Sequence, residues 1–245
     1  QNASLQQVIG LLQKGKLQAI RVTIPEGFTI QQIADELAKD GLGSKEAFLE
    51  AAKTYVPYQY MYGPEPVVYK PEGFLFPSTY EIPVGAKPEE ILKILTKEMN
   101  SQITPAMKQQ IAEKNLTVFQ FITLASLVEK EAKYDEDRPI IAAVFLKRLK
   151  IGMPLQSCAS IQYILGYPKP QLSIEDTELP SPYNTYLHKG LPPGPIANPG
   201  LKSMEAVLNA GDTDYLYFVA DKEGYHHFTK TYEEHLKVVA SIYGE

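Results

Sequence analysis

The chain contains few of the residues that usually mark a metal or cofactor site. It has no tryptophan, and its single cysteine, Cys158, excludes both an intramolecular disulfide framework and a cysteine-rich zinc site. The spacing of the four histidines, at positions 188, 226, 227 and 235, fits none of the usual zinc patterns. Phosphate-binding loops, dinucleotide fingerprints and serine-nucleophile elbows are also missing. We therefore expect neither a metal nor an organic cofactor.

Charge and hydropathy argue against two further classes of partner. The net charge of −5 and the scattered basic residues give no electrostatic basis for binding nucleic acid. No run of 18 apolar residues is present and no secretory signal is visible, so no segment is predicted to span a membrane. The chain begins with Gln1 rather than methionine, which we interpret as the mark of a processed or truncated product.

Tyrosine and proline are abundant, with 16 and 19 copies in 245 residues. A tyrosine ring combines a flat apolar face with a polar tip, which suits sugars and peptides, although most of these rings are expected at half-buried positions. Residues 181–200 are rich in proline and also carry Tyr183, Asn184 and Tyr186. Because proline restricts the backbone, this stiff segment is interpreted either as the wall of a binding groove or as a rigid connector.

The first hundred residues are predicted to form a small unit behind a helical linker at 1–20. A strand beginning at residue 21 leads through a Pro/Gly turn to a helix capped by Thr29, and Ser44 opens another helix. The segment from Ile24 to Leu37 recurs from Ile82 to Leu95 with five matches in register. Duplication and convergence on the same turn chemistry both explain this echo. Residues 72–82 are predicted to be extended and aromatic.

The pattern changes between about 85 and 115, where we place a domain boundary. Thr117 and Gln120 fit a capping box for a helix that runs to residue 133, and a second helix covers 140–150. The stretch from 152 to 200 is predicted to be turn-rich. It is followed by a short helix at 203–209, a hairpin with strands at 215–219 and 226–228, and a final helix at 231–242.

One carboxylate in the first of these helices is out of place for an amphipathic pattern. Glu129 shares a stripe with Val118, Ile122, Ala125 and Ala132, so it is predicted to point toward the core. An apolar environment raises the pKa of a carboxyl group, which suits a general acid. A helix-end glutamate that reaches water or pairs with lysine is the structural alternative. No other acidic residue forms a compelling local pair with Glu129 of the kind that glycosidases use.

Six segments occur in an order that resembles a known family. They are Glu72-Gly-Phe-Leu-Phe-Pro, Leu124-Ala-Ser-Leu-Val-Glu-Lys-Glu-Ala, Arg148-Leu-Lys-Ile-Gly-Met-Pro-Leu-Gln156, Tyr183-Asn-Thr-Tyr, Gly190-Leu-Pro-Pro-Gly-Pro-Ile-Ala-Asn-Pro-Gly200 and Tyr215-Leu-Tyr-Phe-Val-Ala220. Over residues 20–240 the chain resembles the YceG-like (MltG) family of endolytic murein transglycosylases. The resemblance implies an α+β fold. A small LysM-like module with an insertion and an aromatic strand would occupy 21–100, and a mixed α/β catalytic domain with a turn-rich substrate groove would occupy 101–245.

The resemblance also implies a reaction and a set of residues. Glu129 would act first as acid and then as base in cleaving the β-1,4 bond between N-acetylmuramic acid and N-acetylglucosamine, leaving 1,6-anhydro ends. Cys158 stands where family members often have aspartate, which changes the floor of the site. We expect the following residues to bind substrate: Gln156, Tyr183, Asn184, Tyr186, Glu72 and His226.

Partners and location follow from the same resemblance. Peptidoglycan glycan strands are the expected substrate, and cell-wall synthesis proteins at the membrane are expected partners. The protein would work at the outer face of the cytoplasmic membrane, held by an N-terminal anchor that this chain lacks. A muramidase that uses water and a non-catalytic peptidoglycan-binding module are the alternative functions.

Overall fold

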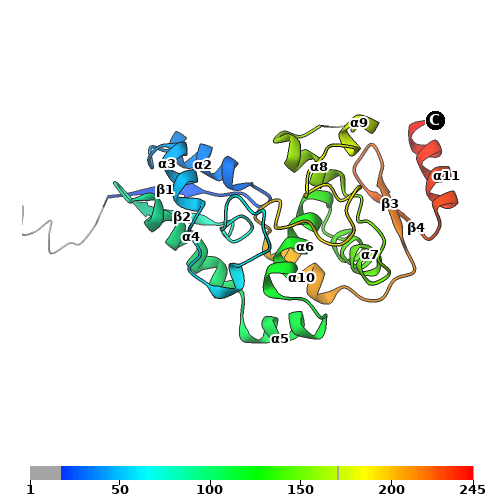
Figure 1. Cartoon of the computed structure of the whole chain (residues 1–245), viewed down its shortest axis with the longest axis horizontal. Coiled ribbons are helices and arrows are strands. Elements are labelled where there is room, and N and C mark those ends of the chain that lie inside the picture. Colours follow the sequence, from blue (N-terminus) through cyan, green and yellow to red (C-terminus); the bar gives the residue numbers. More distant parts are fainter. Residues whose placement is uncertain (1–17, 170, 245) are drawn as a thin grey trace, which may run out of the picture.

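Two separate clusters of buried side chains organise the computed structural model, which describes residues 18–169 and 171–244. The smaller cluster runs from Val22 to Leu95 and the larger one from Met61 to Ala210. Helices with two small antiparallel sheets build around these cores, which agrees with a mixed α and β fold (Figure 1). The predicted helix within residues 1–17 lies outside the described residues.

The N-terminal unit is built on a two-stranded sheet. Strand β1 (Ala19–Thr23) pairs antiparallel with β2 (Thr79–Pro83), and β1 begins two residues before the predicted strand. Helices α2 (Ile30–Lys39), α3 (Lys45–Ala52) and α4 (Pro88–Gln102) pack around the same core. Thr29 caps α2 in a capping box with Gln32, which confirms the predicted helix start.

The echo seen in the sequence corresponds to one structural element used twice. Each of the paired strands leads through a turn into a helix, β1 into α2 and β2 into α4. The turns place Gly27 at φ 75° and Gly85 at φ 81°, a left-handed conformation that glycine adopts at little cost. The two similar sequences therefore form the same strand–turn–helix element.

The connection between α3 and β2 differs from its prediction. Only residues from Thr79 onward are in a strand, so the expected extended segment over 72–78 is wrong. Backbone bonds from Glu72 to Tyr69 and from Phe74 to Pro71 wind this stretch into turns instead. A short 3-10 helix, η1 (Gln59–Met61), precedes it, and Phe74 joins the larger core.

Helix α6 (Val118–Glu131) is the centre of the second unit. Every residue from Phe121 to Val128 is buried, and contacts are made with η1, α5 (Pro105–Glu113), α7 (Arg138–Lys150), α8 (Cys158–Leu165) and α10 (Leu201–Asn209). The capping box of Thr117 and Gln120 is confirmed. The helix ends at Glu131, two residues earlier than predicted, and α5 was not predicted.

The prediction of a turn-rich stretch over 152–200 is wrong in part. Helix α8 and the short α9 (Ile174–Thr177) lie within it. Helix α8 buries Ala159, Ser160 and Ile161 and ends at Leu165. Its C-cap is Gly166, whose left-handed φ of 79° is typical of that position. Neighbouring prolines and glycines hide this two-turn helix in the sequence.

The C-terminal elements form one layer at the end of the molecule (Figure 1). Strands β3 (Tyr217–Ala220) and β4 (His226–Thr229) pair in a hairpin, and α11 (Tyr232–Tyr243) packs against both strands. These bounds confirm the predicted hairpin and final helix to within two residues.

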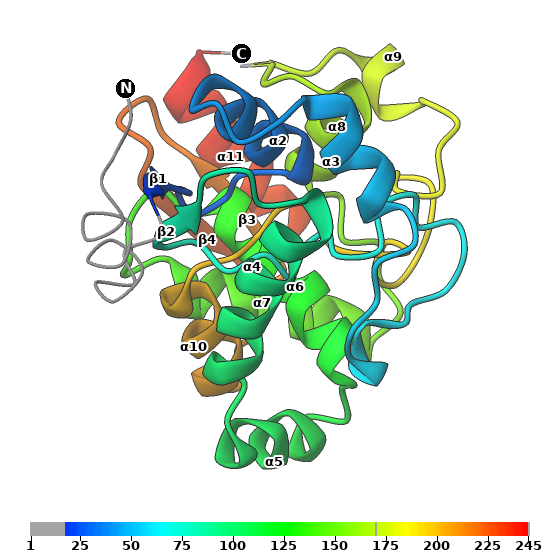
Figure 2. The ribbon, with the colours of Figure 1, turned by 90° about the vertical axis from the view of Figure 1, so that its left-hand side faces the viewer.

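Helix α4 contributes buried residues to both cores. Its residues Ile91, Leu92 and Leu95 belong to the smaller core, whereas Met99 belongs to the larger one. Figure 2 shows α4 in front of the second unit, with α5 projecting from the body. The exact domain limits stay predictions. Among the described residues, no helix is both long enough and apolar enough to cross a membrane.

Candidate active site

Glu129 lies in the last turn of α6, where α7 and the start of α10 meet it. Its side chain is 6% exposed. One carboxylate oxygen accepts hydrogen bonds from the Gly200 N–H (3.0 Å) and from the Ser203 hydroxyl (2.7 Å), and the Arg138 guanidinium lies 3.4 Å from the other oxygen. Gly200 is the N-cap of α10, so the carboxylate lies at the positive end of that helix.

These surroundings differ from the apolar surface that the helix phase predicts. Because α6 is enclosed on all sides between 121 and 128, its phase does not define a single core-facing stripe. The hydrogen-bond and ion-pair partners of Glu129 are polar or cationic, and they stabilise negative charge on its carboxylate. Glu129 is thus a nearly enclosed carboxylate at the junction of three helices.

The cation beside Glu129 is itself held in place. Arg138 donates to Ser203 and, through Nε, to Asp135 at 3.1 Å. Lys202 pairs with Asp135 from the other side, and the hydrogen bonds from Lys202 and Arg138 lower the pKa of that carboxyl group. Glu129 therefore stands at one end of a continuous polar network over α6, α7 and α10.

A second carboxylate, which the sequence analysis missed, reaches this site from the N-terminal unit. Glu26 lies in the turn after β1, and its Oε1 would be 2.0 Å from a Cβ atom placed on Gly200. Burial, followed by the charge of Glu129, raises the pKa of Glu26. The sequence contains one indication of a special role for Glu26. The second copy of the same turn has Val84 at the equivalent position, so the turn conformation does not require an acidic residue there.

The other glutamate of the same motif has different contacts. Glu131 accepts hydrogen bonds from the Ser157 hydroxyl and from the Ala159 N–H, both at the start of α8. The Cys158 sulfur lies 3.2 Å from the Tyr186 hydroxyl, and burial followed by the charge of Glu131 raises the pKa of the thiol. Cys158 and Tyr186 are thus grouped near Glu131 rather than with the contacts of Glu129.

Two predicted sugar ligands differ in accessibility. Asn184 is fully buried, and its side-chain amide donates to the carbonyls of Thr177 and Leu179 while its oxygen accepts from the Tyr186 N–H. These bonds hold the Asn184 side chain inside its own loop, away from the protein surface. Gln156 is exposed and adopts a φ of 49°, an uncommon backbone conformation outside glycine.

Glu72 is buried at the start of α2, with an exposed fraction of 2%. It accepts hydrogen bonds from the Ile30 N–H (3.0 Å), the Asn198 amide (3.2 Å) and the Tyr163 hydroxyl (3.4 Å). Burial raises its pKa to about 8. The Tyr183 ring lies 5.1 Å from the Tyr163 ring, so this predicted ligand belongs to the same cluster.

A cavity of about 290 Å³ opens beside this cluster, between α2 and α8. Amide and phenol side chains contribute to its lining together with Lys130, which follows Glu129 in the chain. The walls include Gln31, Gln162, Tyr163 and Tyr167. Such a mixture of amides and aromatic rings suits the hydroxyl and apolar faces of a sugar.

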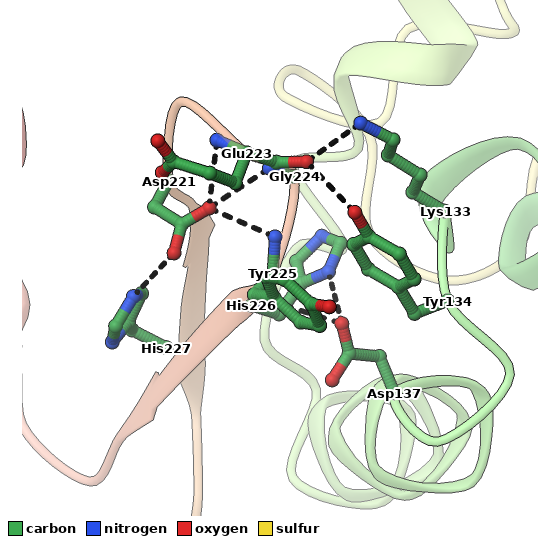
Figure 3. A network of polar contacts seen from close by, with 9 residues as sticks. All are labelled: Lys133, Tyr134, Asp137, Asp221, Glu223, Gly224, Tyr225, His226 and His227. Carbon is green, nitrogen blue, oxygen red and sulfur yellow. Dashed lines mark hydrogen bonds and ion pairs between the residues drawn. The ribbon is translucent and has the colours of Figure 1, made fainter.

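His226 lies in a different network (Figure 3). Its ring is 4% exposed and its Nδ1 is 3.0 Å from an Asp137 carboxylate oxygen, which also accepts from the His226 N–H. On the same hairpin, the backbone carbonyl of Glu223 accepts from the Lys133 ammonium and the Tyr134 hydroxyl, and the ring of Tyr134 stacks on Tyr225 (Figure 3). These contacts dock the hairpin on the segment between α6 and α7.

The last part of the proline-rich segment connects the two units, whereas Tyr183 and Tyr186 earlier in the segment keep some exposed surface. Residues 194–200 are buried, and Asn198 donates to Phe28 and Glu72 and accepts from the Leu75 N–H. This single side chain joins the N-terminal turn, the α3–β2 connection and the loop before α10. Within residues 18–169 and 171–244 no cluster of histidine, cysteine or acidic side chains is suited to a metal ion.

Comparison with known proteins gives consistent matches. Residues 1–241 match the YceG-like family. The chain is 38% identical over 231 residues to an endolytic murein transglycosylase of Bacillus subtilis (strain 168), and 38% identical over 243 residues to one of Streptococcus pneumoniae serotype 2. Each match covers 89% of this chain, but only 64% and 44% of those relatives, so the chain spans less than two thirds of their length.

A solved structure has a similar fold. The crystal structure of a yceG-like protein from Listeria monocytogenes superposes with a TM-score of 0.83 at 34% sequence identity. The match covers 95% of this chain and 80% of that one.

Proposed function

The chain belongs to the YceG-like family, and on that premise we propose that it is a lytic transglycosylase of peptidoglycan. The substrate would be the β-1,4 bond between N-acetylmuramic acid and N-acetylglucosamine within glycan strands. The observation that carries the proposal is the nearly enclosed carboxylate of Glu129, held by donors from α7 and α10.

Glu129 would perform two proton transfers. In the first, its carboxyl proton passes to the glycosidic oxygen as the C1–O bond breaks and an oxocarbenium-like state forms. In the second, the resulting carboxylate takes the proton of the muramyl C6 hydroxyl while that oxygen bonds to C1. The product has a 1,6-anhydro end, and Glu129 returns to its starting form without a second nucleophile.

The donors around Glu129 would stabilise its carboxylate in the interval between the two proton transfers. When the proton has left, the Gly200 N–H, the Ser203 hydroxyl and Arg138 face the new negative charge. Fixed donors directed at developing charge are a major source of catalytic stabilisation. The same arrangement would keep the carboxylate oriented toward the hydroxyl that it must deprotonate.

Substrate would lie along the exposed side of α8 and the cavity beside Lys130. Gln156, Tyr183 and Tyr186 are proposed to position sugars, because each has some exposed surface. Asn184, Glu72 and His226, which were predicted as direct ligands, would act by fixing the loops that carry the other residues. Family membership alone supports work at the outer face of the cytoplasmic membrane, with cell-wall synthesis proteins as partners.

The N-terminal unit is proposed to be a LysM-like, peptidoglycan-binding module. The order β1, α2, α3, β2 with antiparallel pairing of the two strands supports this proposal. Met61, Val67 and Phe74 of the insertion between α3 and β2 lie in the core of the second unit, so the module would bind glycan next to the reaction centre.

The mass of the products tests the proposed reaction. Purified glycan strands, digested with the protein, should yield fragments that end in anhydromuramic acid and are one water lighter than hydrolysis products. Fragments with only reducing ends would show a water-using muramidase instead. Strand binding without any cleavage, unchanged in Glu129→Gln, would show a non-catalytic binding module.

A further inference from the structure

We propose that the stacked rings of Tyr134 and Tyr225 form a second sugar-binding subsite, which holds a pyranose of the glycan strand on the hairpin side of Glu129. The inference rests on the proposed substrate, a glycan strand of peptidoglycan. It gives the β3–β4 hairpin a role in binding that goes beyond its docking on the segment between α6 and α7.

The two rings, called here the tyrosine pair, form a flat aromatic surface beside the hairpin turn (Figure 3). Their centroids are 3.9 Å apart and their planes differ by 9°. One face of the Tyr225 ring lies on Tyr134, yet Tyr225 is 45% exposed. Within residues 18–169 and 171–244 no other aromatic ring stacks on Tyr225. Much of its second face is therefore available to a ligand.

The backbone that carries Tyr225 is held in one conformation. The Asp221 carboxylate accepts hydrogen bonds from the N–H groups of Glu223 (3.0 Å), Gly224 (2.8 Å) and Tyr225 (2.9 Å), as Figure 3 shows. The Asp221 N–H donates in turn to the Tyr225 carbonyl at 2.8 Å. An aromatic surface that is fixed in advance loses little conformational entropy when a ligand binds to it.

Tyr134 is fixed by contacts with the same turn. Its hydroxyl donates to the Glu223 carbonyl at 3.2 Å, and the Lys133 ammonium donates to that carbonyl at 2.6 Å. Gly224 makes room for Lys133, because a Cβ atom on Gly224 would lie 2.4 Å from its Cδ. Lys133 is exposed, and an ammonium group has three N–H donors, so it retains donors for the oxygen atoms of a ligand.

The tyrosine pair is joined to Glu129 by a short series of contacts. Asp135, the neighbour of Tyr134, pairs with Arg138 at 3.1 Å, and Arg138 lies 3.4 Å from Glu129. The cavity between α2 and α8 reaches Glu129 from the N-terminal unit, where a Cβ atom on Gly27 would lie 3.6 Å from Cγ of Glu129. Along the longest axis of the molecule, α6 lies between α2 and the hairpin (Figure 1). The two candidate sites are therefore on different sides of α6.

The chemistry of the tyrosine pair suits a pyranose. The face of an aromatic ring carries partial negative charge, which attracts the C–H groups on the face of a sugar. The hydroxyl and acetamido groups of the sugar project from its edge, where Lys133 and the tyrosine hydroxyls offer donors. Cleavage within a strand requires sugars on both sides of the broken bond. A subsite on each side of Glu129 meets this requirement.

The first test uses the absence of tryptophan from the chain, because a single introduced tryptophan reports only its own surroundings. Tyr225→Trp is combined with Glu129→Gln so that purified glycan strands stay intact. Its emission should shift to shorter wavelength and saturate as strands are added. Tyr62→Trp in the same background is the control, since Tyr62 is exposed beside η1, and its emission should not respond. An unresponsive Tyr225→Trp, at strand concentrations that the wild type cleaves, would overturn the proposal.

The second test measures how cleavage depends on substrate length. On long strands, Tyr225→Ala should raise KM about threefold to tenfold with kcat nearly unchanged, and it should match the wild type on a tetrasaccharide. Tyr225→Phe keeps the ring and should restore most of the affinity. Tyr62→Ala should behave as the wild type on both substrates. No change on long strands, or an equal loss on both substrates, would overturn the proposal, because an equal loss would assign Tyr225 to docking of the hairpin alone.

The two tests separate this subsite from the proposed reaction. A saturable response of Tyr225→Trp, together with wild-type protein that forms no anhydro ends, would overturn the proposed function and leave the subsite intact. Anhydro ends formed by the wild type without any response of Tyr225→Trp would overturn the subsite alone.

Discussion

Ser203 links the two charged groups of the site, because its hydroxyl donates to Glu129 and accepts from Arg138. Ser203→Ala removes this link without changing any charge. A hydrogen bond to a charged group contributes about 1.5–3 kcal/mol, so kcat should fall roughly tenfold to a hundredfold. The rate of anhydro product formation measures this effect. Ser101→Ala, at an exposed position on α4, is the control, and equal rates for both variants would contradict the assigned role.

Glu72 gives the fold a pH dependence of its own. Its folded-state pKa of about 8 exceeds the reference value of 4.5, so the folded state binds more protons between those values. The stabilising contribution is fully present below about pH 4.5 and is lost as the pH rises toward 8, with a slope of up to about 1.4 kcal/mol per pH unit. Urea unfolding across this range should show a flatter dependence for Glu72→Gln. Parallel curves for the variant and the wild type would refute this prediction.

The sequence identified single residues unevenly. Glu129 was selected by phase and then by resemblance, but α6 is buried all round, so phase alone could not have distinguished it from a packed position. Glu26 was missed because a turn residue has no periodicity to compare with. Its contact with Gly200 joins positions 174 residues apart, and no local pattern reports such a distance.

The β3–β4 hairpin is held to the rest of the molecule by buried polar contacts, and this makes His226 a residue for stability. His226→Ala would leave the buried Asp137 without its ring partner, and should lower the free energy of unfolding by about 1–3 kcal/mol. His227→Ala is a matched control, because that ring pairs with Asp221 at an exposed position. Urea unfolding of both variants checks the prediction. A large rise in KM for His226→Ala with unchanged stability would favour direct substrate binding instead.

At the level of elements, capping chemistry was the most informative signal in the sequence. The side chains of Thr29 and Thr117 begin α2 and α6 as predicted, because capping boxes depend on residues three apart. Helix α8 was missed because it is short and enclosed by turn residues. The connection over 72–78 was misjudged since its aromatic composition suited a strand, whereas burial of Phe74 in the larger core required turns.

At the scale of the whole molecule, the end of the proline-rich segment holds the two units together through the hydrogen bonds of Asn198. Asn198 is fully buried and bonds to three segments, so Asn198→Ala should lower the free energy of unfolding by about 2–4 kcal/mol and reduce activity as the Glu26 turn loosens. Denaturant unfolding with parallel activity assays tests both effects. Asn209→Ala, at the exposed end of α10, serves as the control. Full stability in Asn198→Ala would show that backbone contacts alone join the units.

The central claim is that Glu129 is the group that transfers the proton. The most direct measurement is the rate at which anhydro ends form from purified glycan strands with Glu129→Gln, compared with Glu131→Gln from the same motif. We predict that Glu129→Gln loses at least about a thousandfold in rate while binding strands normally, and that Glu131→Gln retains measurable turnover. Anhydro ends formed by Glu129→Gln at a rate close to that of the wild type would contradict the account.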